Sequence, residues 1–181
     1  MKHLLTGEET ERLRFRPIAL TDKPEWLDFF KTKGTAEFIA LGHLNTPEEK
    51  CETYFERCLK RYADGLGGLN VLIDKATNQM VGMCGLLIQT VDGVTRMEVG
   101  YSLLPQHWGK GYASEAAQKC RDYAFENNLT EDLISIIHID NEASKKVART
   151  NGMQVFTTTM YKDFPVDIFR ITKDEWKALK K

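Results

Sequence analysis

The chain has 181 residues, of which 42% are hydrophobic and 28% charged, and this size and composition predict one globular domain over residues 1–181. The formal net charge of −1 provides no long-range positive field, so we expect neither nucleic acid nor an anionic membrane surface as a partner. No stretch approaches the roughly 20 consecutive apolar residues that cross a bilayer, which argues against a helical membrane protein.

The N-terminal residues 1–17 contain acidic residues and arginines almost from the start, unlike the apolar core of a signal peptide. We therefore expect a cytoplasmic protein. Within this stretch Leu13 and Phe15 alternate with arginines, which is typical of a half-buried strand, and Pro17 closes the pattern. The sequence thus predicts a first strand over residues 12–18.

Two helices are predicted next. Aromatic and aliphatic residues at helical spacing predict a helix over residues 22–30. Thr46 then supplies an N-cap, with Pro47 in the first turn and Glu49 as the acid of a capping box. This second helix should end before the glycine-rich loop at residues 64–68.

Extended segments dominate from residue 69 to residue 104. Three β-rich stretches, 69–74, 80–91 and 94–104, are separated by a polar turn and by the Asp92–Gly93 pair. The sequence therefore predicts an antiparallel meander of three strands.

The remaining residues predict alternating helices and strands. An alanine-rich stripe over residues 113–124 favours a helix packed closely on a sheet. The β-branched run at residues 133–139 is typical of a strand buried on both faces. The further elements are a helix capped by Asn141 and ended by Gly152, strands over residues 153–161 and 165–172, and a polar tail over residues 173–181.

Together these elements predict a mixed α/β (α+β) domain, with a mostly antiparallel sheet of about seven strands flanked by about four helices. The four cysteines include no CxxC pair and no metal-like grouping with the histidines, so we expect reduced, mostly buried thiols and no metal site. Edge strands near the C-terminus are free to pair between two copies, so a homodimer is one expected assembly.

The tightest glycine spacing, Gly109 and Gly111, lies where a predicted strand passes into a helix. Unpaired N–H groups at a helix N-terminus suit a phosphate, and Lys110 adds a positive charge. The segment is not a P-loop, since no hydroxyl follows Lys110, and it is not GxGxxG, since Ser114 stands at the third glycine position. The turn therefore indicates either a diphosphate site or only a tight connection.

Two longer segments carry a family resemblance. EVGYSLLPQHWGKGYASEAAQKCRDYAF, residues 98–125, and IHIDNEASKKVARTNGM, residues 137–153, resemble the GNAT N-acetyltransferase superfamily, in particular its ribosomal-protein-alanine N-acetyltransferase-like branch. The resemblance extends over nearly the whole chain. It implies a GNAT-like fold and an N-acetyltransferase that uses acetyl-CoA as its co-substrate.

The resemblance also implies which residues meet acetyl-CoA. Gln106, Gly109 and Gly111 occupy the QxxGxG/A pattern that binds the pyrophosphate in this family, whereas Trp108 stands where many relatives carry arginine. Family members splay the preceding strand at a bulge, and its backbone binds the pantetheine arm. The cofactor-binding residues expected on this basis are Ser102, Leu103, Leu104, Gln106, Trp108, Gly109, Lys110, Gly111, Tyr112, Ala113, Ser114 and Asn141.

Asn141 and Ser144 match an NxxS segment that faces the cofactor in the family, and Asn141 alternatively serves only as a helix cap. Many GNAT enzymes carry a tyrosine seven residues after this asparagine, which acts as the general acid, but Ala148 stands there in this chain. The resemblance therefore implies Ser144 as the catalytic proton donor. Tyr101, Tyr161 and water are the alternatives.

Glu98 is the candidate general base. Strand alternation places Glu98, Gly100 and Ser102 on one face, and a glutamate here resembles a proposed base in several family members. The alternative is a surface glutamate paired with Arg96. His138 is less favoured as a base, because a histidine on a predicted buried strand fits a core position.

The predicted function is acetyl transfer to a primary amine by direct attack of the amine on the thioester. The acceptor is either a protein N-terminal α-amine or a small-molecule amine, and residues 31–46 and 161–165 are expected to select it. A second function stays open, in which a catalytically idle acyl-CoA-binding module senses the cofactor or scaffolds a partner.

Overall fold

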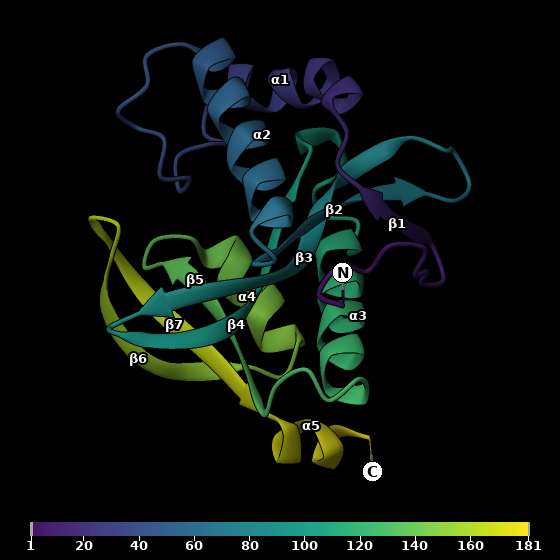
Figure 1. The fold of residues 1–181 in the computed structure, drawn as a ribbon, viewed down its shortest axis with the longest axis vertical. Coiled ribbons are helices and arrows are strands. Elements are labelled where there is room, and N and C mark those ends of the chain that lie inside the picture. The colour runs from purple at the N-terminus through teal and green to yellow at the C-terminus, as the bar shows by residue number, and fades with distance from the viewer. Residues whose placement is uncertain (1, 181) are drawn as a thin grey trace.

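The computed structural model describes residues 2–180 and places seven strands in one mixed sheet (Figure 1). The strand order is β1-β2-β3-β4-β5-β7-β6. The elements are β1 (Leu13–Pro17), α1 (Lys23–Lys31), α2 (Pro47–Ala63), β2 (Gly67–Asp74), β3 (Met80–Val91), β4 (Val94–Leu103), α3 (Tyr112–Glu126), β5 (Asp132–His138), α4 (Glu142–Thr150), β6 (Gln154–Tyr161), β7 (Phe164–Thr172) and α5 (Lys173–Leu179). The predicted fold class is confirmed, with five α-helices in the described range where about four were expected.

The direction of strand pairing changes at β4, in the middle of the sheet. The strands β1, β2, β3 and β4 pair in succession, each antiparallel to the next. The strands β5, β7 and β6 form a second antiparallel group. β4 and β5 run parallel, and their register joins Met97 to Leu133 and Glu98 to Ile134 before it ends. Beyond Glu98 the two strands separate, which opens the sheet toward the C-terminal end of β4 (Figure 1).

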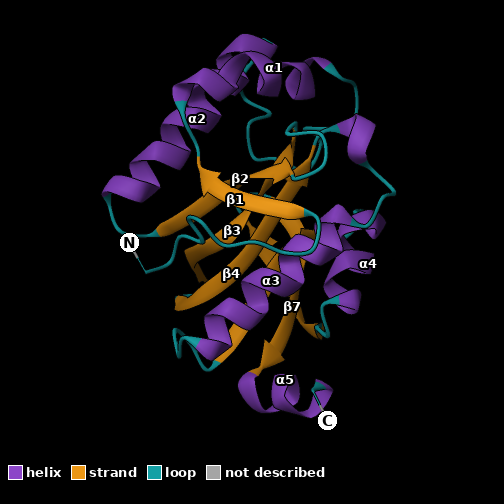
Figure 2. Ribbon diagram, turned by 90° about the vertical axis from the view of Figure 1, so that its right-hand side faces the viewer, coloured by secondary structure: helices purple, strands orange, loops and turns teal. Residues whose placement is uncertain are grey.

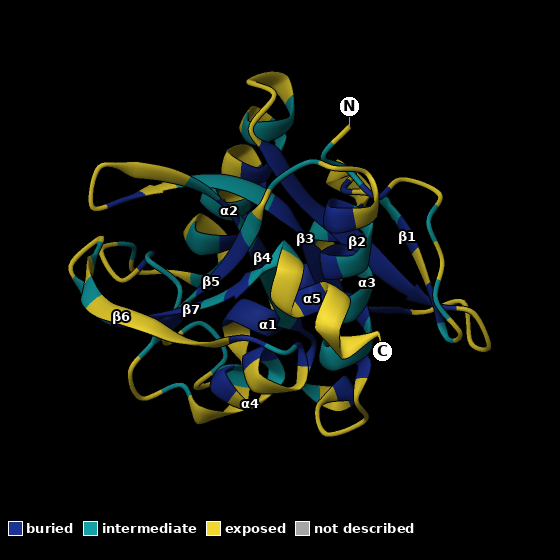
Figure 3. Ribbon diagram, turned by 90° about the horizontal axis from the view of Figure 1, so that it is seen from below, coloured by how far each residue is buried: buried dark blue, intermediate teal, exposed yellow. Residues whose placement is uncertain are grey.

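Helices cover both faces of the sheet (Figure 2). On β2, Val71 and Ile73 pack in a core with α1 and α2, whereas Leu72 between them packs in a core with α3. Because alternate side chains of a strand point to opposite faces, α1 and α2 lie on one face and α3 on the other. Figure 3 shows the central strands as mostly buried and β6, at the edge of the sheet, as mostly exposed.

The C-terminal residues form α5, so the prediction of a polar tail was wrong. Thr172 and Glu175 form a capping box at its start. Trp176 is buried against Phe125, with ring centroids 5.3 Å apart. The Thr-x-x-Glu pattern at residues 172–175 was a local sequence signal for this helix.

Further findings concern the cysteines, metals and membrane spans. All four cysteines are buried and free, as predicted. Within residues 2–180, no group of three or more His, Cys, Asp or Glu side chains has an arrangement that would hold a metal ion. No helix in this range is both long enough and apolar enough to cross a membrane.

A hydrogen bond links the end of β2 to the start of α3. The carboxylate of Asp74 accepts the hydroxyl of Tyr112 and the backbone N–H groups of Ala76 at 2.8 Å and Thr77 at 3.0 Å. These donors, Tyr112 first, lower the pKa of Asp74 from 3.8 to about 2. The interaction helps to fix the first turn of α3.

The Asp74→Asn variant should be less stable than the wild type at neutral pH, and this difference should shrink near pH 2. Because the pKa of Asp74 is lower in the folded protein, its contribution is complete above the unfolded value of 3.8 and is lost as the pH falls toward about 2. Urea denaturation at both pH values measures the free energy of unfolding, with the exposed Asp28→Asn as control. An equal difference at both pH values would contradict the prediction.

Candidate active site

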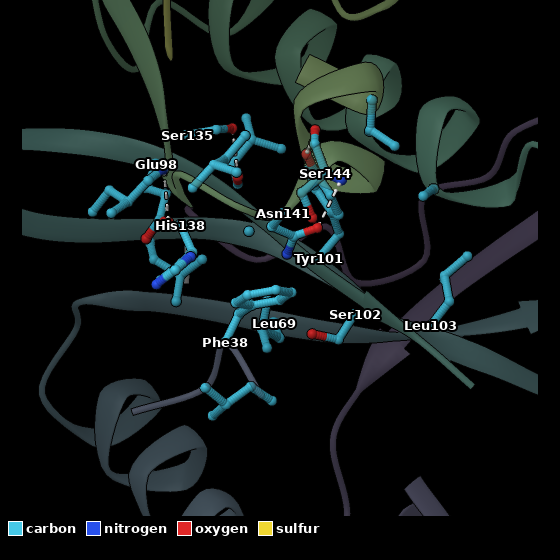
Figure 4. Close-up of a pocket in the computed structure, with 18 of the residues that line it drawn as sticks. Phe38, Leu69, Glu98, Tyr101, Ser102, Leu103, Ser135, His138, Asn141 and Ser144 are labelled. Atoms are coloured by element: carbon cyan, nitrogen blue, oxygen red, sulfur yellow. Dashed lines mark hydrogen bonds between the residues drawn. The ribbon is translucent and has the colours of Figure 1, made fainter. Parts of the chain in front are cut away.

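A cavity of about 1210 Å³ lies where β4 and β5 separate. Figure 4 shows side chains of β4, β5 and α4 around it, with Phe38 approaching from the loop between α1 and α2. The cavity reaches the first turn of α3, where Gly111 and Ala113 line it, and its wall also includes Glu98. A cavity that joins a helix N-terminus to a carboxyl group is the natural candidate for an active site.

The glycine turn leads into a helix that has no side-chain cap. Gly109 and Gly111 have φ values of +73° and +82°, in the left-handed region that glycine adopts without strain. Gly111 is the N-cap of α3, so the N–H groups of the first turn are available to an anion. A Cβ added at Gly109 would meet no atom within 4 Å, so the backbone conformation rather than packing requires glycine there.

An ion pair between the N-terminal segment and α3 holds this turn. Arg12 Nε donates to the Glu115 carboxylate at 2.6 Å, and Arg12 Nη1 donates to the carbonyl of Lys110 at 2.9 Å. The hydroxyl of Thr10 and the backbone N–H of Arg12 also donate to Glu115. Sequence reasoning missed this contact, because Arg12 and Glu115 lie 103 residues apart and no local pattern joins them.

The structure brings most of the predicted cofactor-binding residues to the cavity. Those that line it are Ser102, Leu103, Trp108, Gly109, Gly111, Ala113, Ser114 and Asn141. Of the others, Leu104 and Tyr112 are buried in the cores, and Gln106 and Lys110 are exposed outside the cavity wall. The N–H of Leu104 donates to the carbonyl of Val81 at 3.0 Å and is not free for a ligand.

The expected bulge in β4 is not found, because β4 pairs with β3 without a register shift over its described length. The opening comes instead from the separation of β4 and β5. Ser135 Oγ donates to the carbonyl of Val99 at 2.9 Å, which places that carbonyl on the β5 side. Backbone groups of alternate residues share one edge of a strand, so those of Tyr101 and Leu103 face the opening. The indole N–H of Trp108 donates to the Leu103 carbonyl at 2.8 Å.

Glu98 lies half-buried in the cavity wall and is held by two donors. Gln89 Nε2 donates to one carboxylate oxygen at 2.8 Å, and the N–H of Ile136 donates to the other at 3.4 Å. Gln89 Oε1 in turn accepts the hydroxyl of Tyr161 at 3.2 Å. Gln89 is a residue of the site that the sequence did not reveal, since it lies on β3 and reaches Glu98 only through strand pairing.

The environment of Glu98 suits a general base. Burial raises the pKa of Glu98 above 4.5, and the hydrogen bonds from Gln89 and Ile136 oppose this only in part. The alternative pairing with Arg96 is wrong, because Arg96 Nη1 binds the carboxylate of Asp132 at 2.5 Å. A carboxylate with a raised pKa in a cavity can accept a proton more readily than an ordinary surface glutamate.

Asn141 and Ser144 meet at the start of α4. Asn141 Oδ1 accepts the N–H of Ser144 at 3.1 Å, so its predicted capping role is confirmed, and both residues also line the cavity. The hydroxyl of Tyr101 donates to the carbonyl of Ser144 at 2.8 Å. Ala148 is buried in the core. Ser144 and Tyr101 are therefore the hydroxyl-bearing residues that the structure places together beside α4.

The sequence predicted a core position for His138. In the structure His138 is only partly buried and lines the cavity wall. Its ring lies beside Phe38 and Phe164, at centroid distances of 4.9 Å and 5.6 Å. Nδ1 accepts the backbone N–H of Asp140 at 3.1 Å. With Nδ1 used as an acceptor, the neutral ring carries its proton on Nε2 and offers no second acceptor. This geometry does not suit a general base.

A family model described as "Acetyltransferase (GNAT) domain" matches residues 12–154. The chain belongs to the GNAT acetyltransferase family. The match covers every element from β1 to α4, and so includes the glycine turn and most of the cavity wall. The resemblance seen in the sequence is confirmed, and membership of this family supports the predicted N-acetyltransferase activity.

Relatives of this GNAT chain include two Bacillus proteins, YkkB and p20. The chain is 36% identical to "Uncharacterized protein YkkB" of Bacillus subtilis over 96 residues, which are 53% of this chain and 56% of YkkB. It is 27% identical to "Uncharacterized N-acetyltransferase p20" of Bacillus licheniformis over 146 residues, which are 80% of each protein. The match thus spans just over half of YkkB and most of p20.

Solved structures share the GNAT fold along almost the whole chain. An acetyltransferase from Agrobacterium tumefaciens superposes with a TM-score of 0.76 at 27% identity, over 91% of this chain and 92% of that one. A ribosomal-protein-alanine acetyltransferase from Vibrio fischeri has a TM-score of 0.68 at 20% identity, over 94% and 98%. A spermidine N-acetyltransferase from Vibrio cholerae, in complex with CoA and spermine, has a TM-score of 0.71 at 15% identity, over 93% and 99%. Because the last two structures are only 20% and 15% identical to this chain, their likeness to it shows the fold alone.

Proposed function

We propose that this GNAT chain transfers the acetyl group of acetyl-CoA to a primary amine that attacks the thioester directly. One observation carries the proposal: a single cavity joins the uncapped N-terminus of α3 to the half-buried carboxyl group of Glu98. The first feature suits a phosphate, and the second suits an acceptor for the proton of the amine. The name of p20, an N-acetyltransferase, agrees with this chemistry.

The residues present fit acetyl-CoA, which supplies the thioester. N–H groups of residues 112–114 would hold the pyrophosphate, since no side chain caps them. Backbone groups of Tyr101 and Leu103 would hold the pantetheine arm on the edge of β4 that β5 no longer pairs with. Because the indole of Trp108 donates to the Leu103 carbonyl, it would give up that contact if the arm binds there. Asn141 would contact the same arm from α4.

The Arg12→Ala variant should bind acetyl-CoA about tenfold more weakly than the wild type. Arg12 holds Glu115 and the carbonyl of Lys110, and its loss lets the turn that presents the α3 N–H groups relax. Isothermal titration with CoA measures the effect. Arg14→Ala is the matched control, because Arg14 lies two residues further along, on β1, is bound to Asn78 and lies away from the turn. Equal affinities of the two variants would contradict the prediction.

Two proton transfers complete the proposed reaction. Glu98 accepts the proton of the attacking amine, directly or through water. The hydroxyl of Ser144 passes a proton to the departing sulfur and regains one from water, and a thiol pKa of about 8.5 makes that departure easy near neutral pH. Burial strongly raises the pKa of Tyr101, whose hydroxyl already donates to the Ser144 carbonyl. Tyr101 therefore positions α4.

The test is release of free CoA thiol from acetyl-CoA in the presence of a panel of primary amines, with the acetylated product identified by mass spectrometry. Amine-dependent release is the expected result. Binding of CoA without release for any amine would overturn the proposal and favour the idle acyl-CoA-binding module.

A further inference from the structure

Three positively charged side chains line the cavity on the side of Glu98. Arg57 and Arg61 come from α2, and Lys162 comes from the turn between β6 and β7. Their recorded contacts are with uncharged groups. Arg57 donates to the carbonyl of Ala40 at 3.0 Å, Arg61 donates to backbone carbonyls at 2.7 Å and 3.0 Å, and Lys162 Nζ lies 5.1 Å from the centre of the Tyr161 ring. Within residues 2–180 none of the three forms an ion pair.

Two of these cations, Arg61 and Lys162, lie close enough to the carboxyl group of the proposed base to act on its charge, and Arg57 acts in the same way on Lys162. Arg61 binds the carbonyl of Ile88, next to Gln89, and Gln89 donates to Glu98. Lys162 follows Tyr161, whose hydroxyl donates to the same Gln89. The positive charges therefore lie at the end of the cavity where the amine would react.

Charge at this end of the cavity is not balanced by the protein. The described acidic residues in the cavity wall are Glu98 and Asp64, and Asp64 is paired with Lys60 at 2.9 Å. Arg61 Nε is buried and has no hydrogen-bond partner within residues 2–180. Burial and the charges of Arg57 and Arg61 lower the pKa of Lys162. Three cations against one carboxyl group favour an anionic ligand and disfavour a polycation.

We infer that the acetyl acceptor is a small-molecule primary amine that also carries an anionic group, a carboxylate or a phosphate, held by Arg57, Arg61 and Lys162 beside Glu98. The inference rests on the proposed function and names its substrate class. The same charges also favour the neutral form of the bound amine, because a fourth positive charge among them is destabilised. A neutral amine is the form that attacks the thioester.

The aromatic side chains beside the cations favour a small molecule over a protein terminus. Phe38 reaches from the loop between α1 and α2 to His138 on β5 (Figure 4). His138 in turn contacts Phe164 on β7. The contact between Phe38 and His138 bridges the loop and β5 across one side of the cavity, a span that a small acceptor fits more readily than a polypeptide that continues past the amine. It also offers an apolar surface to the body of the acceptor.

The test compares kcat/KM for matched pairs of amines. Phenylalanine is paired with phenylalaninamide, and phosphoethanolamine with ethanolamine, so that the two anion chemistries are separated; spermidine and a peptide with an acidic N-terminal residue are further arms. We expect at least about a tenfold preference for the anionic member of one pair. Equal use of both members, or a preference for spermidine or the peptide, would overturn the inference and leave the proposed function standing. No turnover with any amine would overturn both.

Variants assign the preference to the cations. Arg57→Gln and Lys162→Gln should each raise KM for the anionic amine about tenfold and leave KM for acetyl-CoA unchanged. Lys50→Gln, on α2 but outside the cavity wall, is the matched control. Lys162→Glu should move the preference toward the uncharged member of the pair. Arg61 is unsuitable for this test because its hydrogen bonds hold backbone carbonyls of Leu66 and Ile88. If Arg57→Gln, Lys162→Gln and Lys162→Glu all keep the wild-type preference for the anionic amine, the assignment is overturned.

Discussion

The Glu98→Gln enzyme is expected to have a kcat about 10²- to 10⁴-fold below that of the wild type, with unchanged affinity for CoA. The amide has nearly the shape of the carboxylate and can still accept a hydrogen bond from Gln89 or Ile136, so the cavity wall should keep its geometry. What the variant loses is the group that accepts the proton of the attacking amine. Steady-state kinetics with a saturating amine, together with CoA titration, separate the two effects.

The pH dependence gives a second readout for Glu98. Burial raises its pKa above 4.5, and a base works only when deprotonated, so the wild-type rate should fall as the pH drops through this raised pKa. In the dependence of rate on pH, the variant should lose the decrease that protonation of Glu98 causes. It should keep the decrease that protonation of the amine itself causes. Glu131→Gln, which removes an exposed carboxylate, is the control. Near-normal turnover of Glu98→Gln from about pH 6 to about pH 9 would contradict the assignment.

The fold was predictable because its signals are local. Alternation at Leu13 and Phe15, the capping box at Thr46 and the Asp92–Gly93 turn each depend on a few neighbouring residues. The same holds for the cap at Asn141, which the structure confirms. The polar tail was mispredicted because α5 is stabilised by burial of Trp176 against α3, and that contact has no local signal.

The candidate site was predictable only where the residues follow one another in the chain. The glycine turn and the asparagine cap each lie within a short segment, and their positions at the cavity agree with expectation. The hydrogen bond from Gln89 to Glu98 and the ion pair between Arg12 and Glu115 arise because segments distant in sequence lie together in the fold. The same is true of the three cations, which come from α2 and from the hairpin turn after β6, and whose charges meet only in the folded protein.

The Gly111→Ala variant is expected to bind CoA about 10²-fold more weakly than the wild type. An alanine at φ +82° costs about 1–2 kcal/mol, and the turn can relieve this strain by rotating the peptide units that precede α3. Such a rotation moves the N–H groups at the start of the helix out of alignment. Loss of two charge-assisted hydrogen bonds to a diphosphate, at about 1.5 kcal/mol each, gives the stated factor.

Gly93→Ala separates this binding effect from simple strain. Gly93 has a φ of +76° in the turn between β3 and β4, and a Cβ there would meet no atom within 4 Å, so the backbone cost is similar while the cavity is untouched. Both variants should lose a comparable free energy of unfolding, measured by urea denaturation. Only Gly111→Ala should lose CoA affinity, measured by isothermal titration. If the two variants bind CoA equally well, backbone strain at Gly111 has no effect on the ligand. The α3 N-terminus then does not hold the diphosphate.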